Sequence, residues 1–406
     1  MRAPPYGPPA AVPVRTDAAF MSGERLPPEA FGAALAALPA VGPGRLAALL
    51  DTWSADEAWA RVIEGRAMRH ERVESTCGPR PALVASEWRR AARATDVADH
   101  WSRYATQGVG VHLLGHAGYP AALAEDHDPP RVLFHRGDLE ALDGTRASIV
   151  GTRRCTRYGH DLALEFGRDL ARAGVRVVSG LALGIDGAAH RGALDAGADG
   201  GAPPVGVVGS GLDVTYPKAH RRLWADVARA GVLLSEAPLG AAPEPWRFPA
   251  RNRIIAALGS VVVVVESHPR GGSRHTVDEA ATRGRRVLAV PGSVRSAASA
   301  FTNELLAEGC HPARDITDVL VALGLSTSVA GTAAGGAGRP EHRPAPDALG
   351  ASVLDALGWD AASLEELAAR TAQPPARLSV VLNHLERDGW VEVRGGWWER
   401  ITEVAG

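Results

Sequence analysis

The sequence predicts an α/β protein built around a mostly parallel sheet, with a helical region before the sheet and a small unit of helices and a β-hairpin after it. Between Arg146 and Val290, six short runs are rich in Val, Ile and Leu; they read ASIVGTRR, VRVVSGLALGID, PVGVVGSGLD, GVLLSE, SVVVVVES and RRVLAVPG. These runs lack polar alternation, as expected of strands buried on both faces. Helical patterns alternate with them, which indicates parallel strands joined by right-handed crossovers.

The length, composition and net charge of the chain narrow the class of protein. A chain of 406 residues suits two or three domains, and a hydrophobic content of 46% is ordinary for a globular protein. The net charge of −2 excludes a basic coat that binds nucleic acid over the whole surface, but it allows a local basic patch. No apolar run approaches the roughly 20 residues of a membrane span, and the first residues lack a signal-peptide pattern. We therefore expect a cytoplasmic protein without a membrane span.

The number and spacing of the cysteines also indicate a cytoplasmic protein. Cys77, Cys155 and Cys310 are isolated and odd in number, so they predict neither a disulfide framework nor a zinc site. This usage is typical of a reducing compartment.

Before the sheet, residues 1–27 read as a Pro-rich flexible tail and residues 28–105 as a helical N-terminal domain. Within that domain the segment LPAVGPGRL, residues 38–46, has an apolar helix end, a tight Gly-x-Gly turn and a second helix. It resembles a helix-hairpin-helix, whose turn can offer amide groups to a DNA phosphate. An ordinary turn between two helices, which needs glycine to reverse direction, is an equally good interpretation.

The α/β domain is expected over residues 106–325, and two strand-like runs within residues 108–138 should form part of its sheet edge. Residues 326–346 read as a flexible linker rich in Gly, Ala, Ser, Thr and Pro. Residues 347–406 predict three helices and a strand pair that turns at Gly395-Gly396, which is the layout of a winged helix. Its third helix has few basic groups, and acidic neighbours offset them, so contact with a protein is as good an interpretation as contact with DNA.

The ends of the predicted strands carry the candidate site. In parallel sheets, ligands bind beyond the carboxyl ends of the strands. Glycines, hydroxyls and arginines follow the first three strands, and exposed amides beside arginines suit phosphate. These candidate residues are Gly151, Thr152, Arg153, Arg154, Ser179, Gly180, Gly209 and Gly211. Asp186, at the start of the next helix, is interpreted as a helix cap, and His190, one turn along, as a local hydrogen-bond partner; neither is interpreted as catalytic.

A second set of candidates lies further along the chain. Lys218 stands at a helix start after Tyr216-Pro217, and residues 247–295 hold nine arginines against one aspartate and two glutamates. Arg251, Asn252 and Arg253 are expected in a first helical turn, where positive charge opposes the helix dipole unless an anion binds there. The turn Gly271-Gly272-Ser273 can form an anion-binding nest. A plain strand-to-helix turn is the alternative.

The sequence lacks the motifs of several kinds of nucleotide-binding protein and nuclease. The Walker pattern and the full G-x-G-x-x-G fingerprint in its strand–helix context are absent, so ATP or NAD use is not supported. No set of Asp, Glu and His has the spacing of a two-metal nuclease. We therefore predict no catalytic residue, no metal and no cofactor.

The ordered set of motifs resembles the DNA-processing protein A (DprA/Smf) family over about residues 147–325. It comprises IVGTRRCTRYG, VVSGLALGIDGAAH, GVVGSGLDVTYP, LLSEAPLG, FPARNRIIAALG, VVVVES, GGSRHT and AVPG. The resemblance implies an extended Rossmann-like fold, flanked by a helical (SAM/helix-hairpin-helix-like) domain and a winged-helix-like domain. The function that it implies is non-enzymatic: the protein would bind and protect incoming single-stranded DNA and load the RecA recombinase during natural transformation and homologous recombination. A homodimer and contact with single-strand binding protein are the further partners that we expect.

Carried onto this chain, the family's basic pocket corresponds to Arg153, Arg154, Lys218, Arg251 and Arg253, together with the turn Gly271-Gly272-Ser273. The chain departs from the family pattern in three places. Arg274-His275 adds a charge to that turn, His220 replaces a usual asparagine, and Phe301-Thr302-Asn303 replaces a usual Gly-Thr-Asn.

Two other functions remain as alternatives. A nucleotide-processing enzyme of the phosphoribohydrolase type shares this sheet and carries Pro-Gly-Gly-x-Gly-Thr-x-x-Glu at one strand end. The corresponding segment here, residues 269–279, lacks the third glycine, and its threonine lies one residue too far along. The other alternative is a chromosomal regulator that acts through the C-terminal unit.

Overall fold

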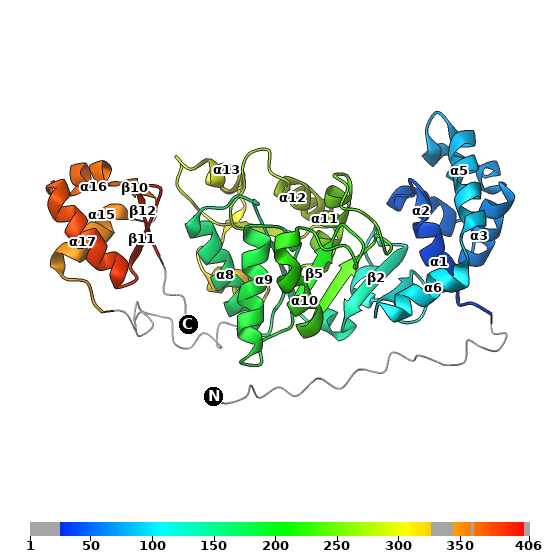
Figure 1. Cartoon of the computed structure of the whole chain (residues 1–406), viewed down its shortest axis with the longest axis horizontal. Coiled ribbons are helices and arrows are strands. Elements are labelled where there is room, and N and C mark those ends of the chain that lie inside the picture. The colour runs from blue at the N-terminus through cyan, green and yellow to red at the C-terminus, as the bar shows by residue number, and fades with distance from the viewer. Residues whose placement is uncertain (1–24, 326–343, 359–360, 402–406) are drawn as a thin grey trace.

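The computed structural model describes residues 25–325, 344–358 and 361–401. A nine-stranded sheet forms the centre of this structure, with a bundle of helices against one edge (Figure 1). The strand order is β1-β2-β6-β5-β4-β3-β7-β8-β9. Strand β2 runs antiparallel to both of its neighbours, β1 and β6. All the other neighbouring strands in this order, β6-β5-β4-β3-β7-β8-β9, pair in parallel. The prediction of an α/β fold with a mostly parallel, extended Rossmann-like sheet is confirmed.

The six apolar runs of the sequence form strands β3 to β8, and the two earlier runs form the antiparallel edge β1 and β2. Strands β5, β6 and β7 are buried at every position, which explains why their sequences lack polar alternation. The strands are β1 (Gly110–Leu113), β2 (Val132–Gly137), β3 (Arg146–Val150), β4 (Arg176–Ser179), β5 (Val205–Val208), β6 (Val232–Ser235), β7 (Val261–Val264), β8 (Arg286–Ala289) and β9 (His311–Pro312).

Helices cover both faces of the sheet. On one face, α8 (Arg157–Arg172), α9 (Ile185–Gly197) and α14 (Ile316–Ala322) pack against alternate strand residues such as Ile149 and Val263. On the other face, α11 (Arg247–Leu258), α12 (Ser273–Thr282) and α13 (Ala300–Ala307) pack against their sequence neighbours, such as Val150 and Val264. The remaining helical segments of this part are α7 (Ala121–Ala124), η4 (Leu139–Leu142), η5 (Lys218–His220), α10 (Arg221–Ala230) and η6 (Ala297–Ser299).

The backbones of α8 and α9 touch through two glycines. A Cβ atom on Gly167 would overlap the carbonyl oxygen of Ala189, and one on Gly192 would overlap that of Leu164. Glycine is therefore required at both positions for this close approach of the two helices.

The N-terminal helices share a core with the antiparallel edge of the sheet. Tyr104 in α6 stacks on Phe134 in β2 with ring centroids 5.4 Å apart, and Trp88 in α5 donates a hydrogen bond to Pro39 O at 3.0 Å in the turn between α1 and α2. The segment that resembles a helix-hairpin-helix is thus part of a packed bundle. Its elements are α1 (Pro28–Ala36), α2 (Pro43–Leu50), α3 (Ala55–Glu64), η2 (Ala67–Arg69), α4 (Glu71–Glu74), η3 (Ser75–Cys77), α5 (Pro81–Ala94) and α6 (Val97–Thr106).

The C-terminal unit is a winged helix, as predicted. It has its own core, which includes Val353, Leu367 and Leu382, and Ser363 and Glu366 form the capping box that begins its second helix. Its elements are α15 (Ala348–Leu357), β10 (Ala362–Ser363), α16 (Leu364–Thr371), α17 (Pro375–Arg387), β11 (Val391–Arg394) and β12 (Trp397–Arg400). The expected tail and linker fall mainly outside the described residues, and the domain boundaries stay predictions.

The described part of the chain has neither a membrane-spanning helix nor a metal-binding cluster. Within residues 25–325, 344–358 and 361–401, no helix is long and apolar enough to cross a bilayer. The same part of the chain holds no cluster of three or more His, Cys, Asp or Glu side chains arranged for a metal ion. The three cysteines are free thiols, and burial raises the pKa of Cys155 to about 11, so this thiol is protonated at neutral pH.

One buried histidine makes stability depend on pH. His190 in α9 is fully buried, and burial lowers its pKa to about 4. In the unfolded chain the same ring titrates near 6.5, so the unfolded state binds more protons at acid pH and the folded state loses stability as the pH falls from about 6.5 toward 4. Between pH 7.5 and 5, we expect this ring to account for a loss of about 2 kcal/mol.

Urea denaturation of the wild type and of His190→Gln at both pH values measures this loss. The variant should lose less stability on acidification than the wild type, whereas His127→Gln, at an exposed position, should match the wild type. Equal acid sensitivity in the wild type and His190→Gln would contradict the assignment.

Candidate nucleic-acid interface

A hollow of about 320 Å³ lies at the carboxyl ends of β3 and β7. These strands are neighbours in the sheet, and the chain order runs in opposite directions on their two sides, so the hollow marks a topological switch point of the kind that binds ligands in α/β proteins. It is lined by Val150, Gly151, Thr152, Arg153, Arg154, Ala182, Asp186, Phe248, Pro249, Arg251, Asn252, Ile255, His268, Gly271, Gly272, Ser273, His275 and Thr276.

A buried glutamate holds the arginine loop that follows β3. Glu266 is 1% exposed, and its carboxylate accepts hydrogen bonds from the amide of Thr156 at 2.8 Å and from the Thr156 hydroxyl at 2.6 Å. The amide of Thr152 donates to the Glu266 carbonyl oxygen at 2.7 Å. Arg153 and Arg154 lie between these two anchors and are exposed to solvent. Two cations are therefore presented from a loop whose backbone is fixed.

The turn that follows β7 forms the opposite wall. Asn252 Nδ2 donates to the carbonyl oxygen of Gly272 at 3.3 Å, and the Ser273 hydroxyl donates to that of Ser267 at 2.6 Å. Helix α12 begins at Ser273 without a side-chain cap, and space is open around Gly272. Such an uncapped helix start beside glycine presents amide groups that suit an oxyanion.

Two aromatic rings, which the sequence analysis did not assign to the site, lie beside this hollow. Tyr216 and Phe248 have ring centroids 5.4 Å apart and line a smaller adjoining hollow of about 50 Å³. The guanidinium of Arg153 lies 5.0 Å from the centroid of the Phe248 ring. An aromatic face beside an arginine is a combination that stacks unpaired bases. The signal in the sequence was the position of Tyr216 just before the helical turn at Lys218 and of Phe248 at the start of α11.

Arg251 stabilises the site through buried contacts beneath its loops. It is 7% exposed, its Nη1 donates to the carbonyl oxygen of Val207 at 2.7 Å, and its Nη2 lies 3.9 Å from the Asp186 carboxylate. Burial raises the pKa of Asp186 and lowers that of Arg251, and each charge opposes the shift of the other. A Cβ atom on Gly180 would overlap the Arg251 guanidinium, so glycine is needed there for Arg251 to reach beneath the loops.

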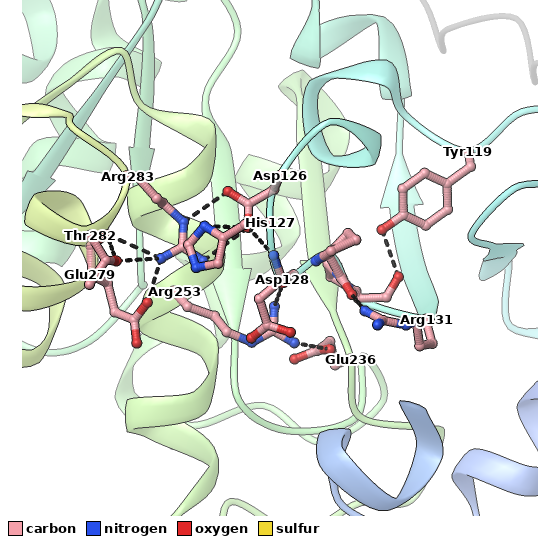
Figure 2. Close-up of polar contacts among 12 residues, drawn as sticks. Tyr119, Asp126, His127, Asp128, Arg131, Glu236, Arg253, Glu279, Thr282 and Arg283 are labelled. Atoms are coloured by element: carbon pink, nitrogen blue, oxygen red, sulfur yellow. Dashed lines mark hydrogen bonds and ion pairs between the residues drawn. The ribbon is translucent and has the colours of Figure 1, made fainter. Parts of the chain in front are cut away.

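Arg253 lies elsewhere, which corrects the expectation that its charge faces a phosphate. It is 7% exposed and forms ion pairs with Glu236 and, at 3.2 Å, with the Asp128 carboxylate (Figure 2). The expectation about the helix start is also wrong, because α11 begins at Arg247 and places both Arg251 and Arg253 in its second turn. Carboxylates of the protein, rather than a bound anion, compensate these charges.

The other predicted residues divide into three groups. Gly180 and Gly209 line the smaller hollow with the aromatic rings. Ser179 is buried and donates to Ile149 O at 2.6 Å, and Gly211 is buried against Pro238 O, so both have structural roles. Lys218 is exposed in η5, just past Pro217, but is not among the residues that line either hollow.

The departures from the family pattern have local partners. Arg274 pairs with Glu304 at 2.8 Å and lies over the Phe301 ring at 4.3 Å, so its charge is compensated within the protein. His220 is buried, and its Nδ1 lies 2.9 Å from Leu181 O. Only His275 among them lines the larger hollow. The expected cap is also different, because α9 is preceded by Gly184 and Asp186 lies in its first turn.

Comparison with known proteins identifies the family of this chain. The family model of the DNA recombination-mediator protein A matches residues 110–324, and that of the DprA winged helix domain matches residues 337–396. The DNA processing protein DprA of Streptococcus pneumoniae is 40% identical over 202 residues, which cover 50% of this chain and 70% of that protein. Protein Smf of Escherichia coli is 32% identical over 293 residues, which cover 70% of this chain and 76% of the relative.

A solved structure gives the same result. The X-ray structure of DNA processing protein A from Streptococcus pneumoniae aligns with a TM-score of 0.60 at 30% identity, covering 73% of this chain and 98% of that one. The family model for the sheet region alone matches more than half of the 406 residues, so the chain belongs to the DNA recombination-mediator protein A family.

Proposed function

We propose that this protein binds single-stranded DNA across the hollow at the switch point and mediates recombination by loading RecA onto that DNA. One observation carries the proposal: Arg153 and Arg154, on the loop anchored by Glu266, line the same hollow as the uncapped start of α12. Guanidinium groups and helix-start amides both bind phosphate, and their placement on two walls suits a backbone that runs between them. Protection of incoming DNA, natural transformation, homodimer formation and contact with single-strand binding protein belong to this proposal as expectations from the family.

The aromatic rings favour a single strand over a duplex. Tyr216 is 40% exposed, and with Phe248 it lines a hollow directly beside Arg153. A base can stack on such a ring only if it has left its own stack, which unpaired DNA permits at little cost. In duplex DNA the bases are already stacked, and only the phosphates would remain to be bound.

The carboxylates around the hollow support a non-enzymatic role. The phosphoribohydrolase alternative needs a free glutamate near the end of its motif, and the candidate here is Glu279. Glu279 instead pairs with Arg283, which is itself held by Asp126 at 2.8 Å. Glu266 holds Thr156, and Asp186 lies beside Arg251. These carboxylates have structural partners, which leaves binding as the better interpretation.

Fluorescence anisotropy with a labelled oligonucleotide tests binding. We expect the single strand to bind more tightly than a duplex of the same sequence. The logarithm of the binding constant should fall with the logarithm of salt concentration, with a slope of roughly −0.7 for each phosphate neutralised. Absence of single-strand binding at low salt would reject the proposal.

The mediator role needs a second experiment. RecA assembly on DNA already coated with single-strand binding protein should be slow without this protein and faster with it. Unchanged assembly, with single-strand binding intact, would retain the DNA-binding function and reject RecA loading. A chain that ends at Leu325 should keep most of its DNA binding, whereas a loss of binding would favour the regulator that acts through the winged helix.

A further inference from the structure

A separate groove of about 990 Å³ lies between the N-terminal helices and the α/β part. One wall is the turn that joins α1 to α2, and the other is the segment before α11. Its charged lining residues are three arginines and one glutamate, so it attracts anions. It is lined by Ala36, Ala37, Leu38, Pro39, Ala40, Val41, Gly42, Pro43, Gly44, Arg45, Thr76, Arg103, Pro238, Leu239, Gly240, Ala241, Glu244, Trp246 and Arg247.

Trp246 gives this groove an oriented aromatic surface. The indole is 43% exposed, and its Nε1 donates to the Glu244 carboxylate at 2.6 Å. The guanidinium of Arg247 lies 4.4 Å from the ring centroid, and the edge of the ring faces Gly42. A large ring that is fixed in place and yet open to solvent loses little entropy when a base stacks on it.

The arginines of the groove are placed to meet phosphates. Arg45 donates from Nε to Thr76 O at 3.2 Å and from Nη1 to Ala40 O at 2.7 Å. These two carbonyl oxygens orient the guanidinium without neutralising its charge, unlike the carboxylates around Arg253. Arg103 is exposed on α6 and lines the same groove. Glu244 offsets Arg247, from which it lies 3.6 Å away, but neither Arg45 nor Arg103 pairs with it in the described structure.

The groove adjoins the proposed DNA site. A narrow hollow of about 30 Å³ lies between them and shares Trp246 and Arg247 with the groove. The same hollow shares Gly209 and Arg251 with the smaller hollow that Phe248 lines. At the start of α11, Trp246 therefore lines the groove and Phe248, two residues later, lines the hollows of the DNA site.

We propose that this groove binds the continuation of the same DNA single strand, with a base stacked on Trp246 and phosphates at Arg45 and Arg103. The N-terminal helical region would then be part of the DNA-binding surface. This inference rests on the proposed function, because its occupant is the strand held at the switch point. The positive charge, the exposed aromatic ring and the closeness of the groove to the DNA site favour a single strand over a peptide or a duplex.

Oligonucleotides of two lengths separate the groove from the main site. A strand of about 6 nucleotides should fill only the switch point, and one of about 20 should also reach the groove. We expect the wild type to bind the long strand more tightly than the short one. Since stacking contributes about 1–3 kcal/mol per base, Trp246→Ala should weaken binding of the long strand about tenfold and leave the short strand unchanged.

Gly44 offers a charge test with a matched control. It is exposed, a Cβ atom there meets nothing within 4 Å, and it lies in the first turn of α2, where an acidic side chain suits the helix dipole. Gly44→Glu should fold and should weaken the long strand about tenfold, whereas Gly44→Gln, of the same shape without the charge, should not. Leu83→Ala, an exposed residue of the same helical region, should leave both affinities unchanged.

The outcomes distinguish the two proposals. If the wild type fails to bind the short strand, the proposed function itself fails. If the short strand binds but added length gives no gain, or the gain survives both Trp246→Ala and Gly44→Glu, the groove does not hold the strand and only the further inference falls. A loss of duplex binding alone in these variants would also overturn it. Ultraviolet crosslinking of iodouracil at either end of the long strand should label the peptide that contains Trp246.

Discussion

Replacing Arg153 and Arg154 together by alanine should weaken single-strand binding about 100-fold at low salt. A hydrogen bond to a charged group contributes about 1.5–3 kcal/mol, and 1.4 kcal/mol corresponds to a factor of ten, so each arginine accounts for at least tenfold. The loop that presents them is anchored through Thr152 and Thr156, and we expect it to keep its shape in the variant. Anisotropy titrations of the wild type and the double variant measure the change.

Salt dependence identifies the contacts as phosphate contacts. Loss of two phosphate contacts should make the log–log slope shallower by about 1.4, because each contact on a single strand contributes about 0.7. Arg229→Ala is the matched control: its side chain is 67% exposed, and it lies near the end of α10, which leads back to the opposite rim of the sheet. If the double variant binds with unchanged affinity and slope, phosphates do not lie on this loop.

Arg253→Ala should lower the free energy of unfolding by about 3–5 kcal/mol, since it leaves the largely buried carboxylate of Glu236 without its partner. Burial already raises the pKa of Glu236, and the charge of Arg253 is the first of the effects that oppose this shift. Arg253 also donates to Asp128 O at 2.8 Å, so its loss frees the segment before β2. The urea midpoints of wild type and variant measure the loss.

A double variant separates a buried ion pair from simple packing. Arg253→Met combined with Glu236→Met removes both charges and should destabilise the protein less than Arg253→Ala alone. At temperatures where it is folded, Arg253→Ala should bind single strands with nearly wild-type affinity. A stable Arg253→Ala variant that binds DNA tenfold more weakly would instead return this arginine to the DNA site.

The strands and the location of the site could be predicted from sequence because both follow local rules. Runs such as Val261–Val264 can only be buried strands in this context, and the order of strands and helices brings the loops after β3 and β7 to one rim. The arginine loop and the turn at Gly271 were therefore expected at the same place. The winged helix could likewise be predicted from its helix lengths and its glycine turn.

Charge partners were not predictable in this way. Arg253 finds Glu236 17 residues away and Asp128 125 residues away, and nothing in a run of arginines shows which guanidinium has a carboxylate beneath it. The same is true of Arg251, which reaches Val207 across 44 residues. Phe248 is the first residue of the FPARNR motif, and Trp246 lies just before it. The exposure of their rings could not be predicted, because it depends on the fold.

The contact between α8 and α9 has a consequence for how fast the protein can capture its target. These helices begin just beyond the Arg153 loop and the Gly184 loop, and Gly167 and Gly192 bring their backbones together so closely that neither can slide. The loops that lead into these two helices are therefore anchored at a rigid helix pair. If the proposed function holds, we expect association with DNA to be limited by diffusion and electrostatic steering rather than by a slow rearrangement of these loops.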